Sequence, residues 1–128
     1  MTLLHHISAI ALGAILGALL RWHLGLWLAK ATALLSLHTL LANWIGALLI
    51  GMAAALFDHH PALPTQWKLF FITGFLGSLS TFSSFSLEIV EMLHAQRYGA
   101  AFLTASLHLF GSLALTIAGM ALIHKIQS

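Results

Sequence analysis

The amino-acid sequence predicts an all-α membrane protein with four transmembrane helices, the third of which is broken near its middle. Hydrophobic residues make up 60% of the 128 positions and charged residues only 6%, a balance typical of membrane proteins. Four charge-free runs, at 3–20, 31–57, 69–87 and 98–124, are each about long enough to cross a bilayer. The third run is also rich in Ser, Thr and Gly. We therefore expect a single transmembrane domain, 1–128, and no soluble domain.

The first helix is expected at 6–28 and carries a close-packing face. Gly13, Gly17 and Arg21 recur at steps of four residues and therefore share one side of the helix. The Gly-x-x-x-Gly spacing lets another backbone approach closely. Arg21 leaves two interpretations open: its side chain extends to the membrane surface beside Trp22, or it attracts anions at the mouth of a pathway.

The second helix is expected at 34–57, after a short loop at 29–33, and carries an amide in the middle third of the span. This amide belongs to Asn43, which shares a helix face with Thr39. An amide at this depth either holds two helices together or offers its NH2 group to a passing anion, and the sequence leaves both roles open. The segment that follows, 58–66, contains both prolines of the chain and is expected to be a loop.

The third helix is expected at 68–94 and contains the most unusual stretch of the sequence. Residues 73–86, TGFLGSLSTFSSFS, include seven Ser or Thr and two Gly within an apolar run. Glycine weakens a helix, and irregular backbone persists inside a bilayer only where protein or a wet cavity satisfies it. Broken membrane helices are typical of ion and substrate sites. Glu88, near the end of this helix, is either a functional group or the ion-pair partner of a basic residue.

The fourth helix, expected at 99–123, carries a regular polar stripe. Thr104, His108, Ser112 and Thr116 recur at steps of four and therefore share one face. Such a stripe either lines a polar pathway or supports packing, since hydroxyls can also hydrogen-bond to their own helix. The polar groups expected within the membrane are thus mostly neutral donors, which can replace the hydration shell of a small anion without trapping it by full charge.

Two phenylalanines, Phe82 and Phe85, are spaced to lie on one side of the third helix beside Ser83. An aromatic ring is negative on its face and positive at its edge, so a ring presented edge-on attracts an anion. Packing against a neighbouring helix is the alternative role for such a pair.

The distribution of basic residues predicts no preferred orientation in the membrane. Lys68 and Lys125 fall on the side that holds the N-terminus, whereas Lys30 and Arg97 fall on the other, together with Arg21 if its side chain reaches the surface. Because an excess of Lys and Arg normally marks the cytoplasmic side, a balanced chain is expected to insert both ways, which allows an antiparallel dimer. The sequence gives no reason to expect a nucleic-acid partner. It also lacks Cys, a nucleophile–base arrangement and a phosphate loop, so no enzyme is expected.

Four stretches, one in each expected helix and in the same order, resemble the motifs of the Fluc (CrcB) family of fluoride channels. The most specific is 74–88, GFLGSLSTFSSFSLE, which resembles the broken third-helix signature of that family. The others are GALLRW at 17–22, TLLANWIG at 39–46, and Gly111-Ser112 followed by Thr116. Ser80 and Ser84 stand where the family usually has Thr, which keeps the hydroxyl, and His38 stands where Gly is common.

This resemblance implies a passive channel that exports fluoride from a bacterial cell and so relieves fluoride toxicity. It implies a multi-pass protein of the inner membrane, assembled as a dual-topology antiparallel homodimer with two pores along the subunit interfaces. The residues implied for the fluoride pathway are Asn43, Phe82, Phe85, Ser83, Ser112, Thr116, Thr39 and His108. Arg21 and Glu88 would lie in the vestibules. The backbone carbonyls of Gly77 and Ser80 would bind a structural sodium ion at the dimer centre.

Two other functions remain open on the residues alone. A small multidrug-type cation/proton antiporter also has four helices and dual topology, but it requires a carboxylate deep in its first helix, and 6–28 contains none. A non-transporting membrane subunit would use the break and the polar stripe only for packing.

Overall fold

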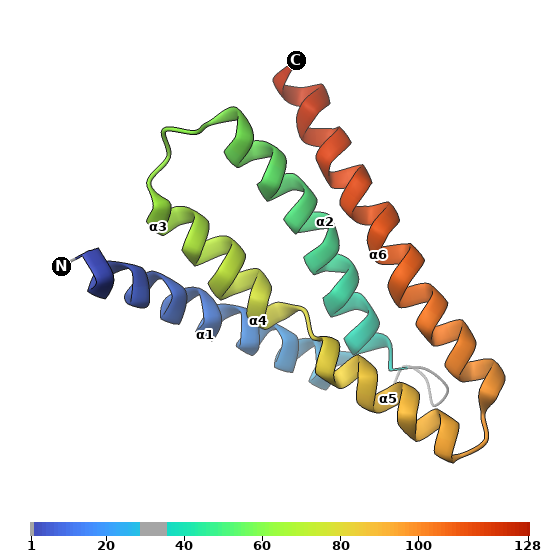
Figure 1. Cartoon of the computed structure of the whole chain (residues 1–128). Helices are drawn as coiled ribbons and strands as arrows, with labels where there is room; N and C mark the ends of the chain where they lie inside the picture. Colours follow the sequence, from blue (N-terminus) through green and yellow to red (C-terminus); the bar gives the residue numbers. More distant parts are fainter. Residues whose placement is uncertain (1, 29–35) are drawn as a thin grey trace.

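The computed structural model describes residues 2–28 and 36–128 of the chain, and every regular element within these ranges is helical. Within the described residues, four segments are long and apolar enough to cross a membrane, and Figure 1 shows how they are arranged. They are α1 (Thr2–Leu28), α2 (Leu37–His59), the composite segment Thr65–His94, and α6 (Tyr98–Gln127). Their mean hydropathy ranges from 1.3 for the composite segment to 2.0 for α1 and α2. The predicted all-α architecture with four candidate spans is therefore confirmed.

The ends of the helices differ by a few residues from the expected bounds. α1 begins at Thr2 and α6 continues to Gln127, so both extend further towards the chain ends than expected. Neither extension contains Gly or Pro, the residues that most disfavour a helix. α2 begins at Leu37. The expected loop at 29–33 and the first residues of the helix expected at 34–57 lie outside the described residues.

The composite third segment consists of helical pieces separated by one break. The pieces are α3 (Thr65–Lys68), the π-helical η1 (Leu69–Leu76), α4 (Gly77–Leu79) and, after the break, α5 (Phe82–His94). At the break, φ and ψ are −80° and 154° for Ser80 and −150° and 118° for Thr81. These are extended conformations, so the helical hydrogen bonds are interrupted here. The predicted break in the third helix is confirmed, and Figure 1 shows it between α4 and α5.

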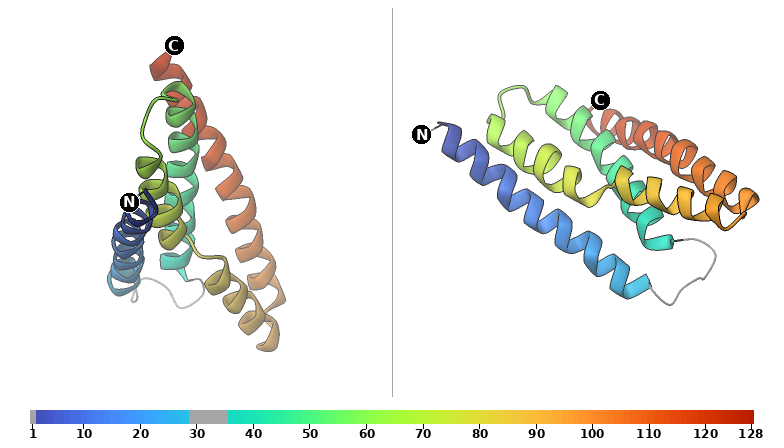
Figure 2. Two further views of the ribbon diagram at one scale, coloured as in Figure 1. Left: turned by 60° about the vertical axis from the view of Figure 1, so that its left-hand side comes forward. Right: turned by 60° about the horizontal axis from the view of Figure 1, so that its bottom comes forward.

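The helices pack as two pairs, and the broken segment belongs to one pair and reaches the other (Figure 2). α1 lies along η1 and α4, α2 lies along α6, and α5 packs against α6. Glycine permits the close approach in both pairs. A Cβ atom on Gly17 of α1 would collide with the carbonyl oxygen of Phe75, and one on Gly51 of α2 with that of Thr116. The close-packing face expected on the first helix is therefore present.

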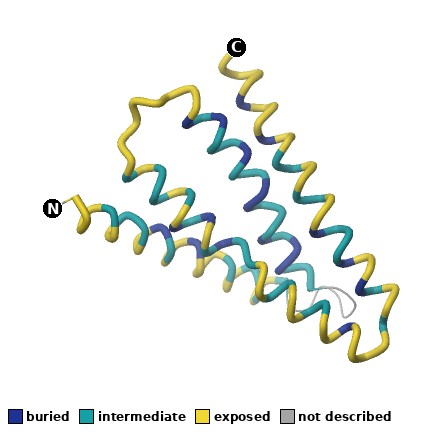
Figure 3. The backbone as a smooth tube through the Cα atoms, viewed as in Figure 1, coloured by how far each residue is buried: buried dark blue, intermediate teal, exposed yellow. Residues whose placement is uncertain are grey.

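The chain buries only a small core and leaves long apolar surfaces uncovered. Ala42, Leu76 and Leu79 form a buried cluster next to the break. By contrast, large apolar residues are exposed along α1 and α6, and Figure 3 shows exposed positions along both helices. A soluble monomer rarely exposes contiguous apolar surfaces of this kind, whereas lipid or another membrane protein covers them in a bilayer. Together with the four spans, these surfaces indicate a multi-pass membrane protein.

Candidate functional site

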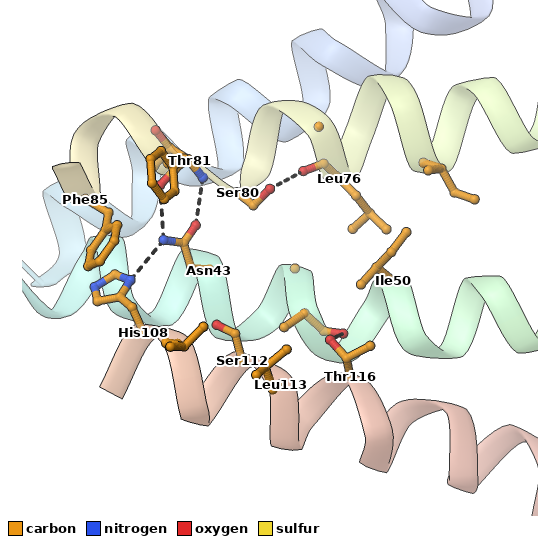
Figure 4. Close-up of a pocket in the computed structure, with 16 residues that line it drawn as sticks. Asn43, Ile50, Leu76, Ser80, Thr81, Phe85, His108, Ser112, Leu113 and Thr116 are labelled. Atoms are coloured by element: carbon orange, nitrogen blue, oxygen red, sulfur yellow. Dashed lines mark hydrogen bonds between the residues drawn. The ribbon is translucent and has the colours of Figure 1, made fainter. Parts of the chain in front are cut away.

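The break in the third segment is held by the side chain of Asn43 on α2. The backbone N–H of Thr81 donates to Asn43 Oδ1 at 2.7 Å, and Asn43 Nδ2 donates to the Thr81 carbonyl at 3.1 Å (Figure 4). Thr81 is extended, so both of its backbone groups need partners outside a helix. One carboxamide supplies both partners and fixes α2 to the broken segment.

Thr81 also begins the helix after the break. Its Oγ1 accepts a hydrogen bond from the backbone N–H of Ser84 at 3.2 Å, which makes Thr81 the N-cap of α5. On the other side, the Ser80 hydroxyl donates to the Leu76 carbonyl at 2.9 Å. The sequence interpretation did not single out Thr81. A Thr directly before a helix is an N-cap signal, but here the surrounding Ser and Thr residues offer several equivalent candidates.

Arg21 closes the end of the helix before the break. Its Nε donates to the carbonyl oxygen of Ser78 at 3.0 Å. That carbonyl lies in the last turn before Ser80 becomes extended, and the last carbonyls of a helix have no partner within it. A cation at this position also interacts favourably with the negative end of the helix dipole. The guanidinium therefore makes a structural contact that neither interpretation of the sequence anticipated.

A cleft of about 490 Å³ opens beside the break, between α2, the broken segment and α6. We call it the central cleft. Polar side chains reach it from all three, for example Asn43, Ser80 and Ser112 (Figure 4). Among the described residues that line it there is no Asp, Glu, Lys or Arg. The expected pathway and sodium residues that line this cleft are Asn43, Phe82, Phe85, His108, Ser112, Thr116, Gly77 and Ser80.

A second cleft, of about 510 Å³, is lined by α1, α2 and α5, and we call it the outer cleft. It contains both residues expected in a vestibule, Arg21 and Glu88. Thr39, which was expected in the fluoride pathway, lines this cleft rather than the central one. Ser83 lines neither cleft, and its hydroxyl lies 3.3 Å from Thr81 Oγ1. The expected site residues are therefore divided between two neighbouring clefts.

His108 occupies the centre of the contacts in the central cleft. Asn43 Nδ2 lies 3.0 Å from His108 Nδ1, and the Phe85 ring packs over the imidazole with 4.3 Å between the ring centroids. Only 5% of His108 is exposed, and its Nε2 has no hydrogen-bond partner within the described ranges. Two other buried oxygen atoms have no hydrogen-bond partner within the described ranges. They are the hydroxyl oxygen of Thr104, one turn earlier on α6, and the carboxylate oxygen Oε1 of Glu88 on α5.

Other members of the expected pathway meet different surroundings. The Phe82 ring lies edge-on to that of Phe85, with centroids 5.6 Å apart and planes at 65°, and Phe82 is 77% exposed. Thr116 donates its hydroxyl to the Ala47 carbonyl at 3.1 Å. Part of the polar stripe on α6 therefore joins α6 to α2, which is the packing interpretation, and the pathway role of the stripe stays a prediction.

The carbonyl oxygens expected to bind sodium lie beside the break. In the described part of the chain, the carbonyl oxygens of Ser78 and Thr81 accept hydrogen bonds from side chains. The carbonyl oxygens of Gly77 and Ser80 accept no backbone hydrogen bond across the break there. The same part of the chain contains no group of three or more His, Cys, Asp or Glu that could hold a metal. A cation here would therefore depend on backbone oxygens, which are ligands of the kind that sodium takes at broken membrane helices.

Comparison with known proteins places this site in a family. The family model described as "CrcB-like protein, Camphor Resistance (CrcB)" matches residues 8–120. A protein of Albidiferax ferrireducens named "Fluoride-specific ion channel FluC" is 58% identical over 120 residues, which are 94% of this chain and 92% of that protein.

Proteins of the same name in other bacteria have a similar sequence identity to this chain. That of Chromohalobacter salexigens is 52% identical over 113 residues, 88% of this chain and 86% of that protein. That of Paracidovorax citrulli is 52% identical over 118 residues, 92% of this chain and 93% of that protein. The match covers all four spans and the break between Asn43 and Thr81, so this chain belongs to the CrcB-like protein family.

Proposed function

We propose that this chain is a passive ion channel selective for fluoride. Relatives at least 52% identical across most of the chain are named fluoride-specific ion channels, which makes the chain a channel rather than an enzyme. The structural observation that carries this function is the central cleft, where Asn43, His108 and Ser112 bring neutral polar groups beside the break and no charged residue is among the described lining. Neutral donors can replace the water around a small anion without trapping it.

In this function, the outer cleft is the vestibule and the central cleft is the narrow part of the pathway. Arg21 places a positive charge in the vestibule, which raises the local concentration of anions. Beyond it, the anion passes the ring edges of Phe82 and Phe85 and the hydroxyl of Ser112. An antiporter would instead need a carboxylate to exchange protons for its substrate, and neither α1 nor the described lining of the central cleft has one.

The working unit of this channel is an antiparallel homodimer in which the two chains cross the membrane in opposite directions. Phe82 supports this proposal because a pore-lining ring must be enclosed, and a single chain leaves 77% of it exposed. The exposed apolar surfaces of α1 and α6 also leave ample area for a partner. The balance of basic residues, which predicts both orientations, supplies the two kinds of subunit in equal amounts.

A sodium ion at the centre of this dimer has a structural role in the proposal. The carbonyls of Gly77 and Ser80 are the ligands, and two chains related by a twofold axis would bring both pairs to one place. The geometry of the break supports this choice of ligands, because among the described residues these two oxygens accept no hydrogen bond across the break. The ion would hold the two breaks together, and no step of fluoride transport passes through it.

The proposed location is the inner membrane of a bacterium, where the channel lowers the fluoride content of the cell. Hydrogen fluoride is a neutral weak acid, so it crosses the bilayer and dissociates in the more alkaline cytoplasm. The anion is then trapped, because a charged group crosses hydrocarbon only at high cost. A passive channel for fluoride gives the anion a way out down its electrochemical gradient.

The test is fluoride efflux from liposomes that contain the purified protein, measured with an ion-selective electrode, with chloride measured in parallel. We expect rapid fluoride release and negligible chloride release. Equal release of both anions would contradict the selectivity. The absence of fluoride release from a well-folded dimer would reject the channel function and leave packing as the role of the break and the polar stripe.

A further inference from the structure

Two exposed histidines meet where α2 and α6 end. His59 is the last residue of α2, and His124 lies in the last turn of α6. His59 Nε2 lies 3.2 Å from His124 Nδ1, and the centroids of the two rings are 5.2 Å apart. Neither residue lines the central or the outer cleft. The pair therefore stands apart from the proposed ion pathway.

The packing of α2 and α6 determines where these two rings lie. The two helices run in the same direction (Figure 1). A Cβ atom on Gly51 would collide with the carbonyl oxygen of Thr116, so the two backbones touch at this level. Eight residues further along each helix, the same register brings His59 to His124. Side chains carried by two closely packed helices keep their separation better than side chains carried by loops.

The distance between the two nitrogens suits a shared metal ion. A zinc ion about 2.0–2.1 Å from each of two imidazole nitrogens in tetrahedral geometry holds them about 3.3 Å apart. The observed separation of 3.2 Å agrees with this value. A hydrogen bond between the rings uses the same distance but needs a hydrogen on one of the two nitrogens. A neutral imidazole can carry its hydrogen on either nitrogen, so both facing nitrogens can become ligands without a net loss of protons.

The electrostatic surroundings of the pair also favour a cation. Because α2 and α6 both end here, the negative ends of two helix dipoles lie next to the pair. The residues that adjoin the pair in sequence include one acid, Asp58, and one base, Lys125, whose charges offset each other. A second base, Lys68, lies over the Phe57 ring, 5.9 Å from its centroid. Phe57 precedes His59 by two residues and so points to the opposite side of α2.

We propose that His59 and His124 form a binding site for a divalent transition-metal ion of the zinc type. Imidazole nitrogens suit zinc, copper and nickel, whereas magnesium and calcium prefer oxygen ligands. Among the described residues, no group of three or more His, Cys, Asp or Glu could hold a metal, so water supplies the remaining ligands of the exposed pair. The bound ion replaces the hydrogen bond between the rings and links the end of α2 to the end of α6. This site does not depend on the channel function, and the two proposals can fail separately.

The first experiment measures Zn²⁺ binding by isothermal titration calorimetry. It uses the purified full-length protein in detergent, prepared without a polyhistidine tag. We expect one zinc ion per chain to bind at the pair. His59→Gln and His124→Gln should each weaken this binding about tenfold or more, because one imidazole alone cannot chelate the ion. The double variant should lose little more than either single variant, since the two ligands act as a unit.

Two other exposed histidines provide the controls. His94 lies at the end of α5, and His60 directly follows His59. We expect His94→Gln and His60→Gln to bind zinc as tightly as the unmodified protein. Each variant must first elute as the same species in size-exclusion chromatography. If zinc binding survives in both His59→Gln and His124→Gln, or if His60→Gln weakens it as much as they do, the pair is not the site.

The second experiment identifies the ligands directly by pulsed electron paramagnetic resonance, with one equivalent of Cu²⁺ per chain as the probe. Imidazole nitrogens also bind copper, and their couplings to the unpaired electron count the rings around the ion. We expect two imidazoles on the ion in the unmodified protein and fewer in His59→Gln and in His124→Gln. Copper with fewer than two imidazoles in the unmodified protein would overturn the site.

The third experiment tests the link between the two helix ends. An ion that binds only the folded chain stabilises it, so saturating Zn²⁺ should raise the midpoint of thermal unfolding by about 5 °C or more. His94→Gln should show the same rise, and His124→Gln should show none. Mg²⁺, which prefers oxygen ligands, should have no effect on any of these proteins. An equal rise in His124→Gln would mean that zinc stabilises the chain elsewhere, and the link between α2 and α6 would be rejected.

Discussion

Phe82 and Phe85 lie one turn apart on α5 but meet different neighbours. Phe85 packs on the His108 imidazole, with 4.3 Å between centroids, so its own chain holds it in place. Phe82 touches Phe85 with its ring edge-to-face and is otherwise 77% exposed. A ring that is free on most of its surface has no packing role within the chain. The Phe82 ring must therefore contact lipid, a second chain or the permeating ion.

We predict that Phe82→Ile slows fluoride efflux about fivefold or more. Isoleucine fills a similar volume but lacks the positive ring edge, a difference of about 1 kcal/mol for a well-placed ring. The measurement is the initial efflux rate from liposomes. Phe102→Ile is the matched control because Phe102 is 76% exposed yet lines neither cleft. Equal rates for the two variants would return Phe82 to a packing role.

Arg21 illustrates what residue-level reasoning from sequence could and could not provide. Its spacing from Gly13 and Gly17 predicts the helix face it occupies, and its charge near a helix end predicts a vestibule or the membrane surface. Neither property reveals that its Nε donates to the Ser78 carbonyl. That bond depends on where the third segment breaks, which brings a carbonyl from 57 positions away to the guanidinium.

At the scale of the elements, the break depends on two partners in other helices. α1 supplies Arg21 to the carbonyl before the break, and α2 supplies Asn43 to the backbone after it. α1 can reach its carbonyl only because it lies against η1 and α4 at backbone contact distance. The glycine face of α1, with Gly13 and Gly17, is therefore needed both for packing and for the contact that Arg21 makes at the break.

We predict that Gly17→Ala lowers the free energy of unfolding by about 1–3 kcal/mol, the usual cost of overpacking. The added methyl group would collide with the Phe75 carbonyl oxygen, which is backbone and cannot rotate away. Unfolding in mixed detergent, followed by circular dichroism, measures the effect.

Gly99→Ala is the control for this prediction, because a Cβ atom on Gly99 meets nothing within 4 Å. Alanine favours helix over glycine, so this variant should be as stable as the unmodified protein or slightly more so. If Gly17→Ala were equally stable, the contact between α1 and η1 would be loose enough to accommodate a methyl group.

The helices could be predicted from sequence because hydropathy and length are local properties. The break could also be predicted, because Gly and hydroxyl residues gather in one apolar run between 73 and 86. The position of the break at Ser80 and Thr81 could not be predicted, because the run contains seven Ser or Thr residues. The hydrogen bond that identifies the break comes from Asn43 on another helix. The placement of Thr39 in the outer cleft likewise depends on how three helices pack together.

At the scale of the whole molecule, the two ends of the bundle differ little in charge. The N-terminus, the α2–α3 connection and the C-terminus lie at one end, and the α5–α6 connection lies at the other (Figure 1). Lys68 and Lys125 belong to the first end and Arg97 to the second. Lys30, counted at the second end in the sequence interpretation, lies outside the described residues. The proposed antiparallel dimer requires two orientations of nearly equal free energy, and such a balance favours them.

We predict that changing this balance abolishes function unless both orientations are restored. A Gln66→Lys and Gln127→Lys double variant adds cations to the first end and should insert with that end in the cytoplasm. A Lys68→Gln and Lys125→Gln double variant should insert the other way. Reporters fused after Ser128, one fluorescent only inside the cell and one active only outside, measure the orientation.

Each double variant expressed alone should fail to protect cells from fluoride, because antiparallel pairs need both orientations. Co-expression of the two should restore protection. Gln66→Glu with Gln127→Glu is the control, since acidic residues contribute little to orientation and the population should stay mixed. If one double variant reports a single orientation and still protects cells on its own, the antiparallel dimer is wrong. The pathway would then have to be enclosed by a parallel pair, because the exposed Phe82 ring still needs a partner to cover it.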